Sequence, residues 1–93
     1  GRGDRFEGLR LARLNPALRD ELGLAANASG VIVLEPGAVG ARIGLRAGDI
    51  LLAVGRYAIE RPSEAARLLA QASGRVAVQV QRGNRRLALR FRV

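Results

Sequence analysis

The sequence predicts a small α+β domain, a partly open antiparallel β-barrel or sandwich capped by two helices. Three observations support this prediction. Two runs of aliphatic residues, 30–34 and 49–54, flank a short turn and have the composition of buried strands. A stretch rich in alanine and leucine, 62–72, has the pattern of a helix. Two strands with alternating apolar residues then close the chain.

The composition argues against catalysis. With 93 residues the chain is expected to form one small domain. It contains no cysteine and no histidine, so a disulfide framework, a thiolate nucleophile and the commonest general base are excluded. Ser63 and Ser73 have no histidine or lysine to activate them. We therefore expect no catalytic residue, no metal site and no cofactor.

The net charge is +8, and all sixteen basic residues are arginine. Because arginine binds carboxylates and phosphates bidentately, acidic peptides, nucleic acid and anionic membrane surfaces are all conceivable partners. The arginines are spread along the chain, which favours ordinary solvated charges. Nucleic acid is not expected as a partner, since there is no aromatic stacking platform and no basic cluster on a helix.

The first third of the chain predicts a strand and a short helix. Residues 1–5 are polar and glycine-rich and are interpreted as a linker or an expression remnant. A partly exposed strand follows, with Leu9 and Leu11 facing inward. Asn15 is expected to cap a helix that starts at Pro16 and is closed by Gly23. Its apolar face is expected to comprise Leu18, Leu22 and Leu24.

The central block 30–54 contains two turns whose residue types indicate their backbone geometry. Pro36 and Gly37 stop the first strand, and a short helical turn ends at Gly44, where glycine accepts a left-handed cap. Asp49 follows a tight turn, and we expect it to accept backbone N–H bonds that hold this turn. A turn and a short strand follow over 55–59.

The last third predicts a helix and a hairpin. The helix starts at Pro62 and ends before Gly74, and Ala65, Leu68, Leu69 and Ala72 share one face. Gly83 and Asn84 are expected to supply the positive φ of a tight hairpin. The inward residues are Val76, Val78, Val80, Leu87, Leu89, Phe91 and Val93. The outward residues are Arg75, Gln79, Gln81, Arg86, Arg90 and Arg92, which make this hairpin the most basic surface.

The segment Gly44-Leu45-Arg46-Ala47-Gly48-Asp49-Ile50-Leu51 resembles the core signature of bacterial PDZ domains. It is most similar to the peptide-binding domains of HtrA/Deg-type, trypsin-like envelope serine proteases. The resemblance implies a PDZ domain over residues 6–93, with the circularly permuted strand order of bacterial members. It fits the second, C-terminal domain of such proteases slightly better than the first.

The resemblance also implies a non-catalytic function. PDZ domains bind a C-terminus or an extended hydrophobic segment as an added strand between an edge strand and the long helix. The carboxylate-binding loop maps to Phe6-Glu7-Gly8-Leu9, which matches an aromatic–any–Gly–aliphatic pattern, and the edge strand to 9–12. The implied peptide-binding residues are Phe6, Glu7, Gly8, Leu9, Arg10, Leu11, Ala12, Ala65, Leu68, Leu69 and Ala72. The leucines among them are equally well explained as core.

The implied setting is the periplasm or cell envelope, with the protease domain and other PDZ domains of the parent protein as partners, in an oligomer. Membrane insertion is not expected, because no apolar run approaches the roughly 20 residues needed. Two alternatives remain open at this point. The domain could be an assembly module that docks through its arginine-rich hairpin with an empty groove. It could also belong to another envelope protease or to a secretion protein.

Overall fold

The computed structural model describes residues 5–93, and the order of its elements is the one that the sequence predicts. Of the predicted linker over 1–5, only Arg5 is among the described residues. The elements are β1 (Arg10–Arg13), α1 (Pro16–Glu21), β2 (Val31–Glu35), α2 (Gly37–Ile43), β3 (Ile50–Val54), β4 (Tyr57–Ala58), α3 (Pro62–Gln71), β5 (Arg75–Arg82) and β6 (Arg85–Arg92).

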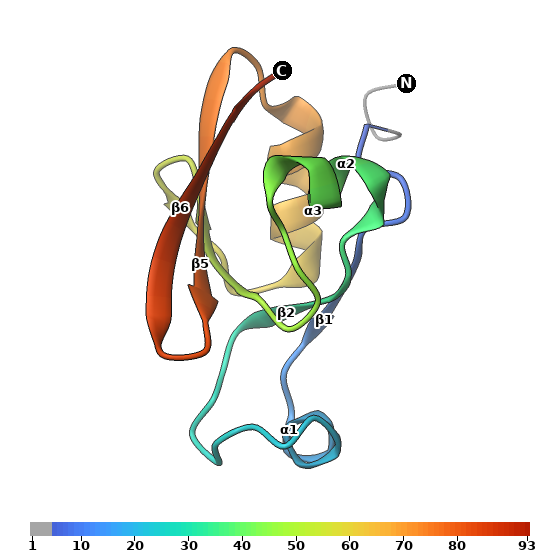
Figure 1. Ribbon diagram of the computed structural model, residues 1–93, viewed down its shortest axis with the longest axis vertical. Helices are drawn as coiled ribbons and strands as arrows, with labels where there is room; N and C mark the ends of the chain where they lie inside the picture. Colours follow the sequence, from blue (N-terminus) through green and yellow to red (C-terminus); the bar gives the residue numbers. More distant parts are fainter. Residues whose placement is uncertain (1–4) are drawn as a thin grey trace.

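The strands of this region form one antiparallel sheet of six strands. The spatial order is β1-β2-β3-β5-β6, and the short β4 pairs with β3. The sheet does not close on itself, so β1 and β6 each keep one unpaired edge within the described part of the chain (Figure 1). The predicted partly open antiparallel architecture is therefore confirmed.

Helices α2 and α3 pack against the sheet more extensively than α1 does. Helix α3 contacts β1 and β3, and α2 contacts β6. Helix α1 lies at the end of the molecule away from α2 and α3 and contains no buried residue (Figure 1). Asn15 caps α1 as predicted, accepting a hydrogen bond of 2.7 Å from the Leu18 N–H. Of the three residues on its predicted apolar face, Leu18 and Leu24 are half-buried, whereas Leu22 is 43% exposed.

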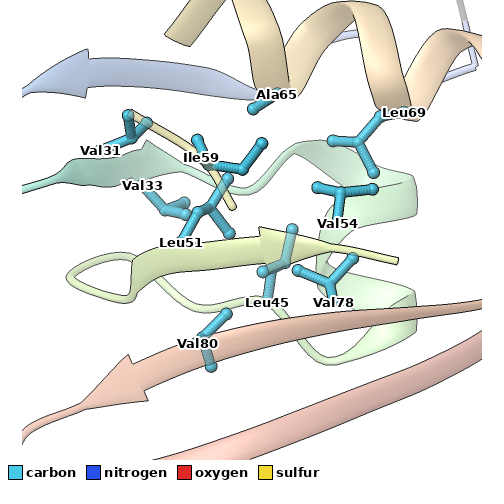
Figure 2. Close-up of a cluster of buried hydrophobic side chains, with 10 residues drawn as sticks. All are labelled: Val31, Val33, Leu45, Leu51, Val54, Ile59, Ala65, Leu69, Val78 and Val80. Carbon is cyan, nitrogen blue, oxygen red and sulfur yellow. The ribbon is translucent and has the colours of Figure 1, made fainter. Parts of the chain in front are cut away.

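The core lies between α3 and the concave side of the sheet (Figure 2). Ala65 and Leu69 point from α3 toward side chains of β2 and β3, and Leu45 and β5 complete the cluster. Burying each aliphatic side chain of this size contributes about 1.5–3 kcal/mol. The predicted inward residues of the final hairpin contact this cluster, except Val93, which follows β6 and is 39% exposed.

Glycine is required where α2 ends against β6. Gly44 has φ +108°, the left-handed cap that the sequence predicts. A Cβ at this position would lie 3.2 Å from Cδ2 of Leu89, so the Leu89 side chain would also have to shift. In the β5–β6 turn Gly83 has positive φ, but Asn84 does not, which contradicts that part of the hairpin prediction.

Asp49 is buried and holds the turn before β3, as predicted. Its Oδ2 accepts a 2.9 Å hydrogen bond from the Arg46 N–H. The sequence did not predict its second partner, Arg82, which donates to both carboxylate oxygens at 2.8 and 2.7 Å and to the Gly44 carbonyl at 2.7 Å. These hydrogen bonds to Asp49 raise the pKa of Arg82. From neutral pH upward, the stabilising contribution of Arg82 is therefore retained until the pH rises through the raised pKa.

Candidate functional site

The loop Phe6–Leu9 forms a tight turn pressed against the start of α2. The Leu9 N–H donates to the Phe6 carbonyl at 3.1 Å, and Gly8 has φ +84°. A Cβ on Gly37 would lie 2.6 Å from the Glu7 oxygen and 2.9 Å from the Leu9 nitrogen. Only glycine allows this approach, and the shape of the loop therefore depends on a residue far along the sequence.

Phe6 anchors the loop to the far edge of the sheet. Its ring is partly buried against the core and meets the ring of Phe91 on β6 edge to face, with centroids 6.0 Å apart and an interplanar angle of 72°. Such a pair contributes about 0.5–1.5 kcal/mol beyond the apolar area that it buries. The loop is thereby fixed to β6 as well as to α2.

Two backbone N–H groups of the loop have no partner in the part of the chain that the structure describes. Within residues 5–93, neither the Glu7 N–H nor the Gly8 N–H has a hydrogen-bond acceptor. Adjacent amides in a turn of this kind form an anion-binding site. The Glu7 side chain is exposed, so solvent screens its repulsion of an incoming carboxylate.

Arg5 connects the start of the loop to the end of α3. Its Nη1 donates to the Ala72 carbonyl at 2.7 Å and more weakly to the Leu69 carbonyl at 3.5 Å. These carbonyls lie at the C-terminal end of α3, where positive charge is favourable, and that of Leu69 also accepts the Ala72 N–H at 3.4 Å. Arg5, the last residue of the predicted linker, is therefore held against α3 beside the candidate site.

Strand β1 presents a free main-chain edge next to α3. Among the described residues β1 pairs with β2 alone, and α3 packs against it. The Leu14 N–H donates to the Gly30 carbonyl at 2.8 Å, which sets the alternation along the strand. By this alternation Ala12 directs its N–H and C=O toward β2, while Leu11 and Arg13 direct theirs to the open edge.

The structure brings only some of the predicted site residues together. Leu9 and Leu11 are partly buried against the core, and Ala65 and Leu69 are fully buried beneath α3. Arg10 is exposed and forms a cross-strand ion pair of 3.4 Å with Glu35 on the surface of the sheet.

Leu68 and Ala72 lie elsewhere. Together with Val54, Tyr57 and Val76 they line a separate depression of about 300 Å³. Successive helix residues are rotated by about 100°, so Ala66 and Ala70 lie on the flank of α3 opposite Leu68. We infer that Ala66 and Ala70 form the flank that faces β1. The apolar spacing of α3 identifies its core face but does not distinguish its two flanks, so neither residue was among the predicted site residues.

The described residues contain no group of His, Cys, Asp and Glu side chains suited to a metal ion. No helix in residues 5–93 is long and apolar enough to cross a membrane.

The chain is similar to known proteins in both sequence pattern and fold. The family model described as "PDZ domain" matches residues 30–82. No curated protein matches the chain. The structure titled "HtrA-type protease AlgW with decapeptide" is 24% identical with a TM-score of 0.78, over 89% of this chain and 26% of that chain. The HtrA3 PDZ domain bound to the phage-derived ligand FGRWV is 28% identical with a TM-score of 0.71, over 91% of this chain and 80% of that chain. This chain thus spans about a quarter of the AlgW chain.

Proposed function

The chain belongs to the PDZ domain family, and on that premise we propose that it binds C-termini or extended hydrophobic segments as an added strand along β1. A PDZ domain is a binding module and not an enzyme. The two similar structures, AlgW and the HtrA3 domain, each contain a peptide. The observation that carries the proposal is the unpaired edge of β1, which lies beside α3 and starts at the loop Phe6–Leu9.

The main chain of this edge supplies the affinity. A ligand strand would exchange hydrogen bonds with Leu11, whose N–H and C=O face the open edge. At the end of the ligand strand, the Glu7 and Gly8 amides would bind the terminal carboxylate. Arg5 would add positive charge next to this position, because it is held on the end of α3.

The side chains around the edge favour an apolar terminal residue. Leu9 and Leu11 would line the pocket, and Leu69 and Ala65 would form its buried floor. Alanines at positions 66 and 70 leave room for a branched or aromatic side chain such as Val, Leu or Phe. Leu68 and Ala72 would then support α3 from its other flank instead of contacting the ligand.

An NMR titration of the labelled domain with FGRWV, as free acid and as C-terminal amide, tests this proposal. We expect shifts at residues 6–12 and on the Ala66–Ala70 flank of α3, and weaker binding by the amide. Ala70→Arg should abolish binding, whereas the matched variant Gln71→Arg, on an exposed position beyond that flank, should not. Binding that survives Ala70→Arg unchanged would contradict the proposed groove.

The similarity to HtrA-type domains supports a further step. We place the domain in an envelope or periplasmic serine protease of that type, where peptide capture regulates the protease domain within an oligomer. In the full-length protein, Ala70→Arg should then remove the response of proteolysis to added peptide and leave the unstimulated rate unchanged. Retention of the peptide response would rule out this regulatory role.

A further inference from the structure

The edge of the sheet opposite the groove is formed by β6, where positive charge is concentrated. Strand β6 ends the sheet, and within residues 5–93 it pairs with β5 alone (Figure 1). Arg86, Arg90 and Arg92 are exposed on it, on the same face as Arg75 of β5. The chain has no Asp or Glu after Glu64, so neither strand of this hairpin supplies a compensating carboxylate.

The hydrogen-bond alternation shows which main-chain groups face the open edge. Gly74 and Val93 exchange both N–H···O=C bonds, at 3.0 and 2.9 Å. Hydrogen-bonded pairs alternate along the register from this pair. The main-chain N–H and C=O groups of Phe91, Leu89 and Leu87 therefore point toward β5. Arg86, Ala88, Arg90 and Arg92 direct theirs away from it. Three of these four residues, Arg86, Arg90 and Arg92, therefore offer an incoming strand both main-chain groups and a guanidinium side chain.

The charge pattern indicates which kind of strand can bind at this edge. Arg75 lies directly opposite Arg92, and like charges in this position repel each other. Arg75, Arg90 and Arg92 also border a depression of about 580 Å³, which has room for carboxylate side chains. In an extended segment, side chains at every second position face the same way, which matches the spacing of Arg90 and Arg92. A second copy of β6 would bring arginine against arginine and is disfavoured.

We propose that the free edge of β6 binds an extended acidic segment of a partner protein, with Asp or Glu at alternate positions, by strand addition. The segment exchanges main-chain hydrogen bonds with Ala88 and Arg90, and its carboxylates pair bidentately with Arg90 and Arg92. This site is separate from the β1 groove, and it does not depend on the peptide-binding function proposed above.

The test is an NMR titration at about 0.15 M salt, where unspecific surface attraction is screened beyond about 8 Å. The probe is an acetylated and amidated peptide in which Glu alternates with Thr and Val, so it offers no terminal carboxylate to the β1 groove. We expect shifts at 86–92 and not at 7–12; Phe6 is left out of this comparison because its ring contacts Phe91. The same peptide with Gln in place of Glu should bind at least about tenfold more weakly.

Two variants separate strand addition from simple charge attraction. Arg90→Glu with Arg92→Glu should abolish binding and should still fold, because the reversed position 92 lies opposite Arg75. The control Arg42→Glu with Arg56→Glu makes the same change in net charge at exposed positions elsewhere and should bind normally. Ala88→Pro removes an edge N–H that does not pair with β5, so the sheet persists while binding falls.

Three results would overturn the proposal. Binding that survives the double reversal at Arg90 and Arg92 would do so, as would the absence of shifts at 86–92. Binding that is unaffected by Ala88→Pro, and is reproduced by a short oligonucleotide or by anionic vesicles, would show a general anion-binding surface instead of strand addition.

Discussion

The ring of Phe6 meets the ring of Phe91 edge to face at 6.0 Å, and this contact joins the loop at the β1 groove to the strand at the opposite edge of the sheet. The two residues are 85 positions apart in a chain of 93. The proposed carboxylate-binding loop beside β1 therefore depends on β6 for its position.

Phe91→Ala should weaken binding of FGRWV by about tenfold without removing any ligand contact, because Phe6 loses its partner. Leu87→Ala is the matched control, since Leu87 is on the same face of β6 and is also partly buried against the core. Both variants should lose about 1–3 kcal/mol of unfolding free energy. Titration calorimetry and urea denaturation measure the two effects, and equal affinity in both variants would show that Phe91 serves the core alone.

Gly37→Ala should displace the loop Phe6–Leu9. The new Cβ would lie 2.6 Å from the Glu7 oxygen, and φ at this position is +71°, so we expect a loss of about 1–3 kcal/mol and weaker peptide binding. Gly55→Ala isolates the backbone part of this cost, because Gly55 has φ +60° and open space around it. Peptide affinity should be unchanged in Gly55→Ala. If it is also unchanged in Gly37→Ala, peptide binding does not depend on the shape of the loop.

Arg82→Ala should lower the unfolding free energy by about 2–4 kcal/mol, because it leaves the buried Asp49 carboxylate without its cationic partner. Arg82→Lys should restore part of this loss, since an ammonium cannot reproduce the two parallel bonds. Arg85 is exposed in the same hairpin, so the unfolding free energy of Arg85→Ala should stay within about 0.5 kcal/mol of that of the parent protein. Urea denaturation of the three variants gives the comparison, and a near-neutral Arg82→Ala would show that solvent replaces the guanidinium.

Asn15→Ala should act locally. The substitution removes the hydrogen bond to the Leu18 N–H and should destabilise α1 by about 1 kcal/mol. Because α1 contains no buried residue, global unfolding and peptide affinity should not change. Hydrogen exchange of the α1 amides should therefore accelerate while the melting temperature stays constant. A lowered melting temperature would mean that α1 folds cooperatively with the sheet.

The sequence by itself determined the elements and their order, because their signals are local. Asn15, Pro16 and Gly44 act on helix ends within a few residues, and the alternation of β5 and β6 lies within each strand. The role of Asp49 at its turn is local in the same way, since its partner Arg46 is three residues away. Each of these features could be predicted from neighbouring residues alone.

The tertiary structure decided which of these residues meet. Arg82 reaches Asp49 across 33 residues and Arg5 reaches Ala72 across 67, distances over which residue patterns carry no information about contact. The contact of Gly37 with the loop and the exposure of α1 are also set by the tertiary structure. The flank of α3 that faces β1 also depends on how the helix is rotated on the sheet. Packing of the whole core sets that rotation, and the apolar spacing of the helix does not.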